Sequence, residues 1–126
     1  MAPVVGRIRT KATFRALSRP DGRARRGPVS VDFSRVAGTG GLPLVGYAIG
    51  RRHGNAVARN RLRRRLRAAV RAAGPCLDAG AYLVRATPGV DELDFEGLCR
   101  AVSDAARSAA DRARSAAGDG EGREER

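Results

Sequence analysis

Residues 54–71 read GNAVARNRLRRRLRAAVR, an arginine-rich segment in which apolar residues recur at helical spacing. On a wheel of 3.6 residues per turn the apolar side chains fall on one narrow arc, and arginines occupy most of the remainder. The members of the arc are Ala58, Leu62, Leu66, Ala69, Val70 and Ala73. A segment of this kind cannot be buried on all sides. It therefore predicts an amphipathic helix that packs on a core by one face.

The exposed face of this helix carries charge of one sign. Residues 33–77 hold ten arginines and no Asp or Glu. Solvated helix faces usually mix signs, because like charges four residues apart repel each other. Here the charges form an uncompensated ladder of Arg59, Arg63, Arg67 and Arg71. Guanidinium groups make planar, bidentate contacts with phosphates and need no tuned protonation state. The segment predicts binding of a polyanion, and its small apolar residues disfavour a membrane-surface helix.

The charge is unevenly divided along the chain. Residues 1–77 contain 18 Lys and Arg against two acids, and residues 78–126 contain seven against eleven, so the net charges are +16 and −4. By its length the chain is one domain, which we expect to span 1–117, followed by a disordered polar tail at 118–126. No run of about 18 apolar residues could span a membrane, and the first residues lack the apolar stretch of a secretory signal. We expect a cytoplasmic location and no membrane partner.

Periodicity and turn residues predict six elements of secondary structure. Alternating or continuous apolar residues indicate strands at 29–33, 44–49 and 81–86. Helices are predicted at 10–17, at 55–73 with Asn55 as the N-cap, and from Asp94 onward. The order helix-strand-strand-helix-strand-helix is typical of an α+β fold, a small two-layer sandwich with helices on a mixed sheet. The glycine-rich segment 37–43 suits a hairpin loop and lacks the context of a phosphate-binding loop.

The segment 46–67, GYAIGRRHGNAVARNRLRRRLR, is similar to the signature of the bacterial ribonuclease P protein component. In that family a strand leads through two basic residues into Gly-Asn-Ala-Val and then an Arg-Asn-Arg helix, and the resemblance extends over residues 7–112. It implies an RNA-binding subunit of a ribonucleoprotein whose catalytic RNA, with Mg²⁺, removes the 5′ leader from precursor tRNA. It also implies a left-handed βαβ crossover through the arginine-rich helix, against the usual right-handed rule.

The same resemblance implies which residues contact RNA. The positions expected to face the catalytic RNA are Arg51, Arg52, Asn55, Arg59, Asn60, Arg61, Arg63, Arg64 and Arg67. The expected cleft for the single-stranded leader of precursor tRNA contains Phe14 with Lys11 beside it, Phe33 and Tyr47. From the residues alone each of these aromatics could equally belong to the core, and for Phe33 a core position is favoured. Ser18 stands where the family often has a second aromatic, so base stacking should be thinner here.

No set of residues has the pattern of a protein catalytic site or metal site. His53 is the only histidine, and acid–base cleavage of RNA by a protein would usually need a second histidine or a carboxylate. Four acids lie within residues 91–96, at a turn and a helix start, where capping and the helix dipole explain them. We therefore expect no catalytic or metal-binding residue in the protein, no small-molecule substrate, and Mg²⁺ bound mainly by the RNA subunit.

Two other functions stay open on the sequence alone. A ribosomal or general RNA-binding protein on a similar fold would also bind phosphates with a steep dependence on salt, but it would not distinguish leader-bearing tRNA from mature tRNA. Sequence-specific DNA binding is less favoured, because neither a helix-turn-helix partner nor a zinc pattern accompanies the arginine-rich helix.

Overall fold

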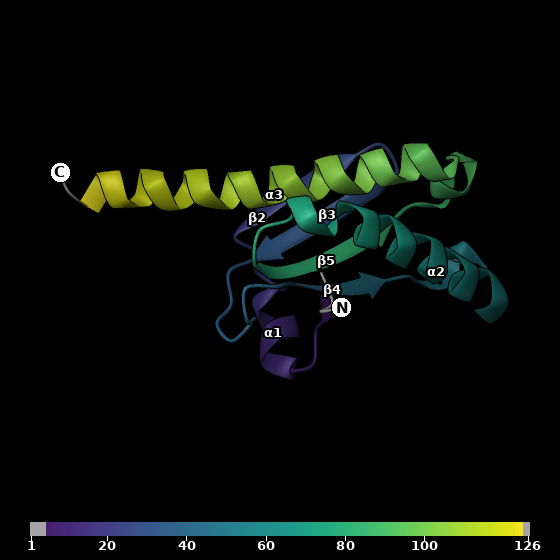
Figure 1. Cartoon of the computed structure of the whole chain (residues 1–126), viewed down its shortest axis with the longest axis horizontal. Helices are drawn as coiled ribbons and strands as arrows, with labels where there is room; N and C mark the ends of the chain where they lie inside the picture. Colours follow the sequence, from purple (N-terminus) through teal and green to yellow (C-terminus); the bar gives the residue numbers. More distant parts are fainter. Residues whose placement is uncertain (1–4, 125–126) are drawn as a thin grey trace.

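A five-stranded mixed sheet forms the centre of the structure, a computed structural model that describes residues 5–124 (Figure 1). In chain order the strands are β1 (Gly6–Arg7), β2 (Gly22–Arg26), β3 (Val29–Ser34), β4 (Pro43–Ala48) and β5 (Gly80–Ala86). In space their order is β1-β4-β5-β3-β2. β4 is parallel to β1 and β5, and β3 is antiparallel to β5 and β2. The expected α+β class with a mixed sheet is confirmed.

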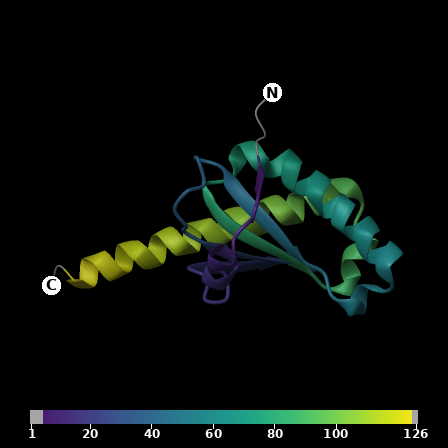
Figure 2. The same ribbon diagram turned by 90° about the horizontal axis from the view of Figure 1, so that it is seen from below.

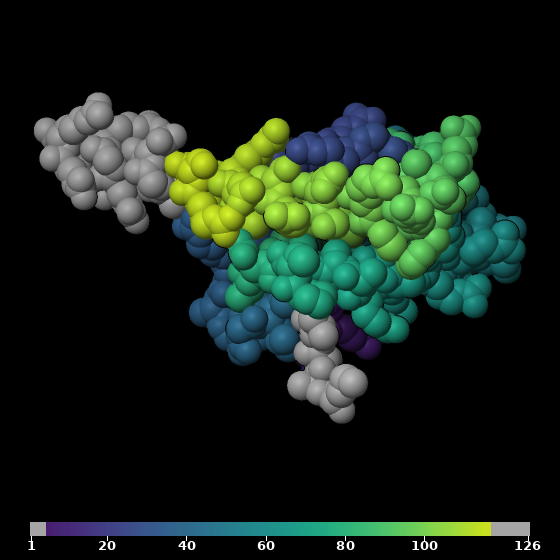
Figure 3. Space-filling model, turned by 45° about the horizontal axis from the view of Figure 1, so that its top comes forward, coloured from purple at the N-terminus to yellow at the C-terminus, as the bar shows by residue number. Residues whose placement is uncertain are grey.

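Three α-helices cover the two faces of the sheet unequally. They are α1 (Lys11–Ala16), α2 (Ala56–Ala73) and α3 (Phe95–Glu124), and the short 3-10 helices are η1 (Arg51–His53), η2 (Gly74–Cys76) and η3 (Pro88–Glu92). α2 and α3 lie side by side on one face, and Figure 3 shows α3 running along α2. The short α1 lies on the other face, seen from below in Figure 2, which we call the open face.

The core lies between the sheet and the pair α2 and α3. Alternation along β3 turns Val29, Val31 and Phe33 toward these helices, where all three are buried. The buried alanines of α3 are Ala105, Ala106, Ala109, Ala110 and Ala113. Small residues allow a close approach, since a Cβ on Gly22 of β2 would lie 1.9 Å from the Ala109 carbonyl oxygen. α3 therefore packs almost directly on the backbone of β2.

All six predicted elements are present, with the expected caps. The Asn55 side chain accepts a hydrogen bond from the Ala58 N–H at 2.9 Å, and the Asp94 side chain accepts one from the Gly97 N–H at 2.7 Å. The prediction missed β1, which is two residues long, and β2. β2 reads GRARR, with its glycine and alanine buried and its arginines exposed. Such small residues give almost no hydrophobic signal, so the alternation along β2 is hidden in the sequence.

The glycine-rich segment between β3 and β4 is not a hairpin loop, so that prediction was wrong. β5 lies between β3 and β4 in the sheet, and the segment carries the chain past β5. Gly38, Gly40 and Gly41 have φ angles of 77°, 65° and 80°, which glycine adopts without strain. A hairpin is predicted from the local sequence alone. That sequence does not show that β5, which follows later in the chain, inserts between β3 and β4.

α3 continues further than the sequence predicts. The helix runs to Glu124, so residues 118–124 of the expected disordered tail have a helical backbone here. Residues 125–126 of that expectation lie outside the described residues. Gly118, Gly120 and Gly122 are poor helix formers, so the sequence of this segment gives no signal for a helix.

Candidate nucleic-acid interface

α2 presents its arginines because its other side is buried. The buried side chains are Leu62, Leu66, Ala69, Val70 and Ala73, and the remaining member of the predicted apolar arc, Ala58, is partly buried. The exposed arginines are Arg61, Arg64, Arg67 and Arg71, and the partly exposed ones are Arg59, Arg63 and Arg65. Burial of one side fixes the rotation of the helix about its axis. The direction of the guanidinium groups relative to the sheet is thereby fixed as well.

Individual arginines of α2 differ in what they contact. Arg63 Nη1 donates a hydrogen bond to Asn60 Oδ1 at 2.9 Å, so the polar residue between the arginines holds a neighbouring guanidinium in place. Arg65 Nη2 donates to the Leu93 carbonyl oxygen at 2.6 Å and ties α2 to the segment before α3. Arg65, which the resemblance does not assign to RNA, therefore has a structural contact. Arg61 is exposed on the outer side.

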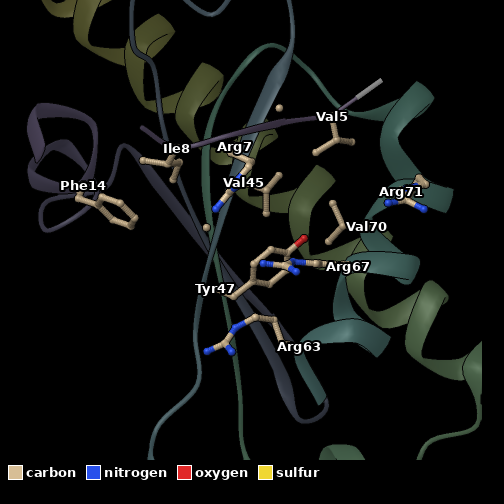
Figure 4. A pocket seen from close by; sticks show the side chains of 12 residues that line it. Val5, Arg7, Ile8, Phe14, Val45, Tyr47, Arg63, Arg67, Val70 and Arg71 are labelled. Atoms are coloured by element: carbon tan, nitrogen blue, oxygen red, sulfur yellow. The ribbon is translucent and has the colours of Figure 1, made fainter. Parts of the chain in front are cut away.

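A groove follows the edge of β4 beside α2, and we call it the edge groove. β1 pairs only with Leu44 and Val45 of β4, so this side of β4 is unpaired from Gly46 onward. The groove has a volume of about 430 Å³ and four arginines in its walls. The lining residues (Figure 4) are Val5, Gly6, Arg7, Ile8, Phe14, Val45, Gly46, Tyr47, Arg63, Arg67, Val70 and Arg71. It combines apolar surface with a high density of positive charge.

Tyr47 lines the edge groove from the side of α2. Burial raises the pKa of its phenol to about 12, although the Arg67 and Arg71 guanidinium groups act in the opposite direction. The guanidinium carbon of Arg67 lies 6.0 Å from the ring centroid, at the outer limit of a cation–π contact. Tyr47 is thus a neutral aromatic wall against which Arg67 rests (Figure 4).

Phe14 lines the edge groove from the open face. Figure 4 shows its ring on the other side of β4 from Tyr47. The ring packs over Gly46, where a Cβ would lie 3.2 Å from Phe14 Cε1, and 48% of the residue stays exposed. Lys11, one turn earlier on α1, is exposed but does not line the groove. An exposed aromatic ring close to basic side chains suits stacking with an unpaired base.

Phe33 is not part of the groove, which corrects its assignment to the leader cleft. The residue is 3% exposed, and its ring packs against Tyr82 with centroids 4.9 Å apart and planes inclined by 58°. Its position on β3 turns it toward α2 and α3, together with Val29 and Val31. Phe33 is a core residue in this fold, as the pattern of β3 alone had favoured.

The basic residues that precede α2 surround a second hollow, at the carboxyl end of β4. Arg51 and Arg52 are exposed in η1, and Arg52 lines this hollow of about 650 Å³. His53 Nε2 lies 2.7 Å from the Ala86 carbonyl oxygen, so the imidazole holds η1 against the end of β5. The Asn55 amide oxygen already accepts the capping bond of α2. Asn55 is therefore explained as a cap, and the two arginines are available to a ligand.

The assignment from sequence missed several basic side chains that the fold brings to this region. Arg7 lines the edge groove, and so does Arg71, which belongs to the predicted arginine ladder but not to the residues assigned to RNA. Arg23 and Arg85 lie on the open face, on either side of the buried Asp32. The alternation of arginine with small residues along β2 was the available signal for Arg23. It carries information only if residues 22–26 are known to form a strand.

Two features are absent from the described part of the chain. No three or more His, Cys, Asp and Glu side chains within residues 5–124 are placed together so that they could hold a metal ion. Mg²⁺ is usually bound by one or two carboxylates together with phosphate oxygens, so this finding concerns only a site built from protein side chains alone. Every described helix also falls short, in length or in apolar character, of what crossing a membrane requires.

The fold and the groove place the protein in a structural class. It is a small α+β domain that combines a helix face of exposed arginines with a groove lined by arginines and aromatic rings. These are the features of a small basic domain that binds nucleic acid. The sequence model of the family Ribonuclease P matches residues 3–110. The chain belongs to the ribonuclease P protein family.

Curated relatives named ribonuclease P protein component agree with this membership. The relative from Micrococcus luteus is 36% identical over 111 residues, which covers 79% of this chain and 84% of the relative. The relative from Thermobifida fusca is 35% identical over 109 residues, which covers 81% of this chain and 74% of the relative. The relative from Brucella suis is 41% identical over 73 residues, and here the chain spans about half the length of the relative, 50%.

Solved structures share this fold at low sequence identity. The Staphylococcus aureus RNase P protein aligns with a TM-score of 0.65 at 18% identity, covering 83% of this chain and 93% of that protein. The RNase P protein from Thermotoga maritima aligns with a TM-score of 0.67 at 19% identity, covering 79% of this chain and 94% of that protein. At such identities the likeness shows the fold alone.

Proposed function

We propose that the chain is the protein subunit of a ribonuclease P ribonucleoprotein. In this role it binds the catalytic RNA and the 5′ leader of precursor tRNA, and it promotes endonucleolytic removal of the leader. The observation that carries the proposal is the arrangement of α2, whose outer side holds exposed arginines while one flank borders a groove with aromatic walls. Family membership supports the same role.

Two neighbouring surfaces suit two different kinds of RNA. The outer side of α2, with Arg61 and Arg64 exposed, presents donors that bind phosphates of any sequence, as a large folded RNA requires. The edge groove, with Phe14 and Tyr47 in its walls, suits a single strand, because only unpaired bases can stack on an aromatic side chain. We assign the catalytic RNA to the first surface and the leader to the second.

In this proposal the RNA subunit and its Mg²⁺ ions perform the cleavage. The protein contributes positive charge close to two polyanions, which lowers the phosphate repulsion between catalytic RNA and substrate. Lower repulsion favours substrate binding and also the binding of Mg²⁺ by the RNA. We assign no step to an ion held by protein side chains alone. We place the ribonucleoprotein in the cytoplasm, with no small-molecule substrate.

A binding competition tests the proposal. The protein is assembled with a ribonuclease P RNA, and its dissociation constants for precursor tRNA with a leader and for mature tRNA are compared at one salt concentration. We expect about tenfold tighter binding of the precursor, because stacking on an aromatic adds about 1 to 3 kcal/mol per base. Equal binding of the two tRNAs would exclude leader recognition and would favour a general RNA-binding protein on the same fold.

A further inference from the structure

The open face of the sheet carries one buried acid between two arginines. Asp32 of β3 is 2% exposed, while Arg23 of β2 and Arg85 of β5 approach it from the two neighbouring strands. Arg23 is the direct cross-strand partner of Asp32, and Arg85 is the partner of Ser30, which lies two residues before Asp32 on β3. Since Val31 faces the helices, the three charged side chains all lie on the opposite, open face.

The two arginines contact different oxygens of the Asp32 carboxylate. Arg23 Nε donates a hydrogen bond to Oδ1 at 3.0 Å. Arg85 Nη2 lies 2.9 Å from Oδ2 as an ion pair, without the geometry of a hydrogen bond. A buried carboxylate is costly unless it is paired, so the burial of Asp32 requires both cations. The carboxylate in turn holds one guanidinium group at each of its two oxygens.

Most donors of these guanidinium groups stay available to a ligand. The side chains of Arg23 and Arg85 are 62% and 50% exposed, although the acid between them is buried. A guanidinium has five N–H donors, and the contacts with Asp32 involve one nitrogen of each arginine. Two cations around one anion leave one positive charge, and the remaining donors of both arginines surround the same carboxylate. Such a pair matches the oxygens of a phosphate.

The surroundings of this pair are also basic. Arg25, two residues after Arg23 on β2, is the cross-strand partner of Ser30 and lies on the same face. Arg52 lines the hollow at the end of β4 together with Ser30 and Arg85. A phosphate chain that leaves the edge groove by way of the open face would therefore meet positive charge along its path.

We propose that Asp32 is a positioning residue, which sets Arg23 and Arg85 as a fork for one backbone phosphate of the single-stranded leader. We call this pair the arginine fork. The inference deepens the proposed function and rests on it, because it assigns the leader a phosphate contact on the open face. Asp32 itself does not touch RNA in this arrangement. It acts through the two arginines.

The direction in which replacing Asp32 changes RNA binding separates a positioning role from a purely electrostatic one. An acid in a basic face repels phosphate, so replacing Asp32 with Asn raises the net charge by one and should strengthen RNA binding if charge alone matters. If Asp32 positions the fork, the same replacement releases both guanidinium groups and weakens leader binding despite the added positive charge. The two roles predict changes in opposite directions.

The experiment compares variants of the protein assembled with ribonuclease P RNA. Dissociation constants for precursor tRNA and mature tRNA are measured for wild type, Asp32→Asn, Arg23→Gln and Arg85→Gln. We expect each variant to bind precursor tRNA about fivefold to tenfold more weakly, the effect of losing about one hydrogen bond to a charged group on a partly exposed surface. Binding of mature tRNA should stay unchanged. Arg107→Gln, an exposed site on α3 with the same loss of charge, is the matched control and should change neither constant.

Several outcomes would overturn the arginine fork. They are tighter or unchanged binding of precursor tRNA by Asp32→Asn, equal losses on both tRNAs, or a loss with Arg107→Gln as large as with Arg85→Gln. Thermal unfolding of each variant shows whether it is folded. If Asp32→Asn is not folded, the test of the arginine fork rests on Arg23→Gln and Arg85→Gln, whose side chains are exposed. A wild-type complex that does not distinguish the two tRNAs overturns the proposed function together with the fork. If the wild-type complex prefers precursor tRNA and the variants show the same preference, the arginine fork alone is overturned.

Discussion

At the scale of single residues, the arginines of α2 make different contacts because their surroundings differ. Within α2, Arg63 is held by Asn60, Arg65 binds the Leu93 carbonyl, and Arg67 rests against Tyr47. The sequence could identify a one-signed helix face, because that property depends on composition and spacing. It could not separate structural arginines from available ones, since the partner of Arg65 lies 28 positions away in the chain.

The aromatic residues show the same division. Phe14 is 48% exposed beside Gly46, and Phe33 is 3% exposed beside Tyr82. The alternating pattern of β3 correctly favoured a core position for Phe33, while the family resemblance placed it in the cleft. The pattern prevailed, because the face on which a residue of a strand lies follows from its place in the alternation.

Replacing Phe33 with Ala should mainly destabilise the protein. Loss of a buried aromatic ring and the resulting cavity typically cost about 3 to 5 kcal/mol of unfolding free energy, which urea unfolding of the protein without RNA would measure. At a temperature where the variant is still folded, its preference for precursor over mature tRNA should equal that of wild type. A small change in stability with a lost preference would place Phe33 at the RNA surface instead.

Replacing Phe14 with Ala should change stability little and weaken the binding of precursor tRNA. Because the ring is half exposed, we expect the unfolding free energy to change by less than about 1.5 kcal/mol, below the cost of a fully buried side chain. Binding of precursor tRNA should weaken by about fivefold or more if a base stacks on the ring, with mature tRNA unaffected. Equal losses on both tRNAs would show that Phe14 has no part in leader binding.

At the scale of elements, the sequence predicted what is local and missed what is distant. α2 was placed at residues 55–73 because periodicity, an Asn cap and a following Gly-Pro all agree there. β2 was missed because its buried positions are small, and the segment 37–43 was misread because β5 inserts between β3 and β4. The order of strands depends on such long-range pairing. The edge groove follows from that order, so its full set of walls could not be predicted.

The outer side of α2 can be tested as a unit. We expect Arg61→Gln with Arg64→Gln to weaken binding of the RNA subunit and to lower the slope of log affinity against log salt by about 1.4 to 1.8, since each lost phosphate contact counts about 0.7 in a single strand and about 0.9 in a duplex. Binding titrations at several salt concentrations give this slope. Arg100→Gln with Arg107→Gln on α3 removes the same charge from another element, and a similar loss of slope there would show that net charge, and not α2, determines binding.

At the scale of the whole molecule, the charge is divided between a binding part and a supporting part. Residues 1–77, with a net charge of +16, build α2, the edge groove and four of the five strands. Residues 78–126, with a net charge of −4, build β5 and α3, and α3 packs against β2, β3 and α2. Arg114 of α3 pairs with Asp78 and Asp111, so part of this half is neutralised internally. The excess positive charge thus lies on the part that holds α2 and the edge groove.

Such an excess of charge repels itself in the free protein and is relieved when a polyanion binds. We propose that this polyanion is the RNA subunit of ribonuclease P together with its substrate. The most direct measurement is the rate of 5′ leader removal from precursor tRNA by that RNA, with and without the protein, at near-physiological Mg²⁺ and salt. We expect the protein to raise the rate well above that of the RNA alone. A rate that the protein leaves unchanged would contradict it.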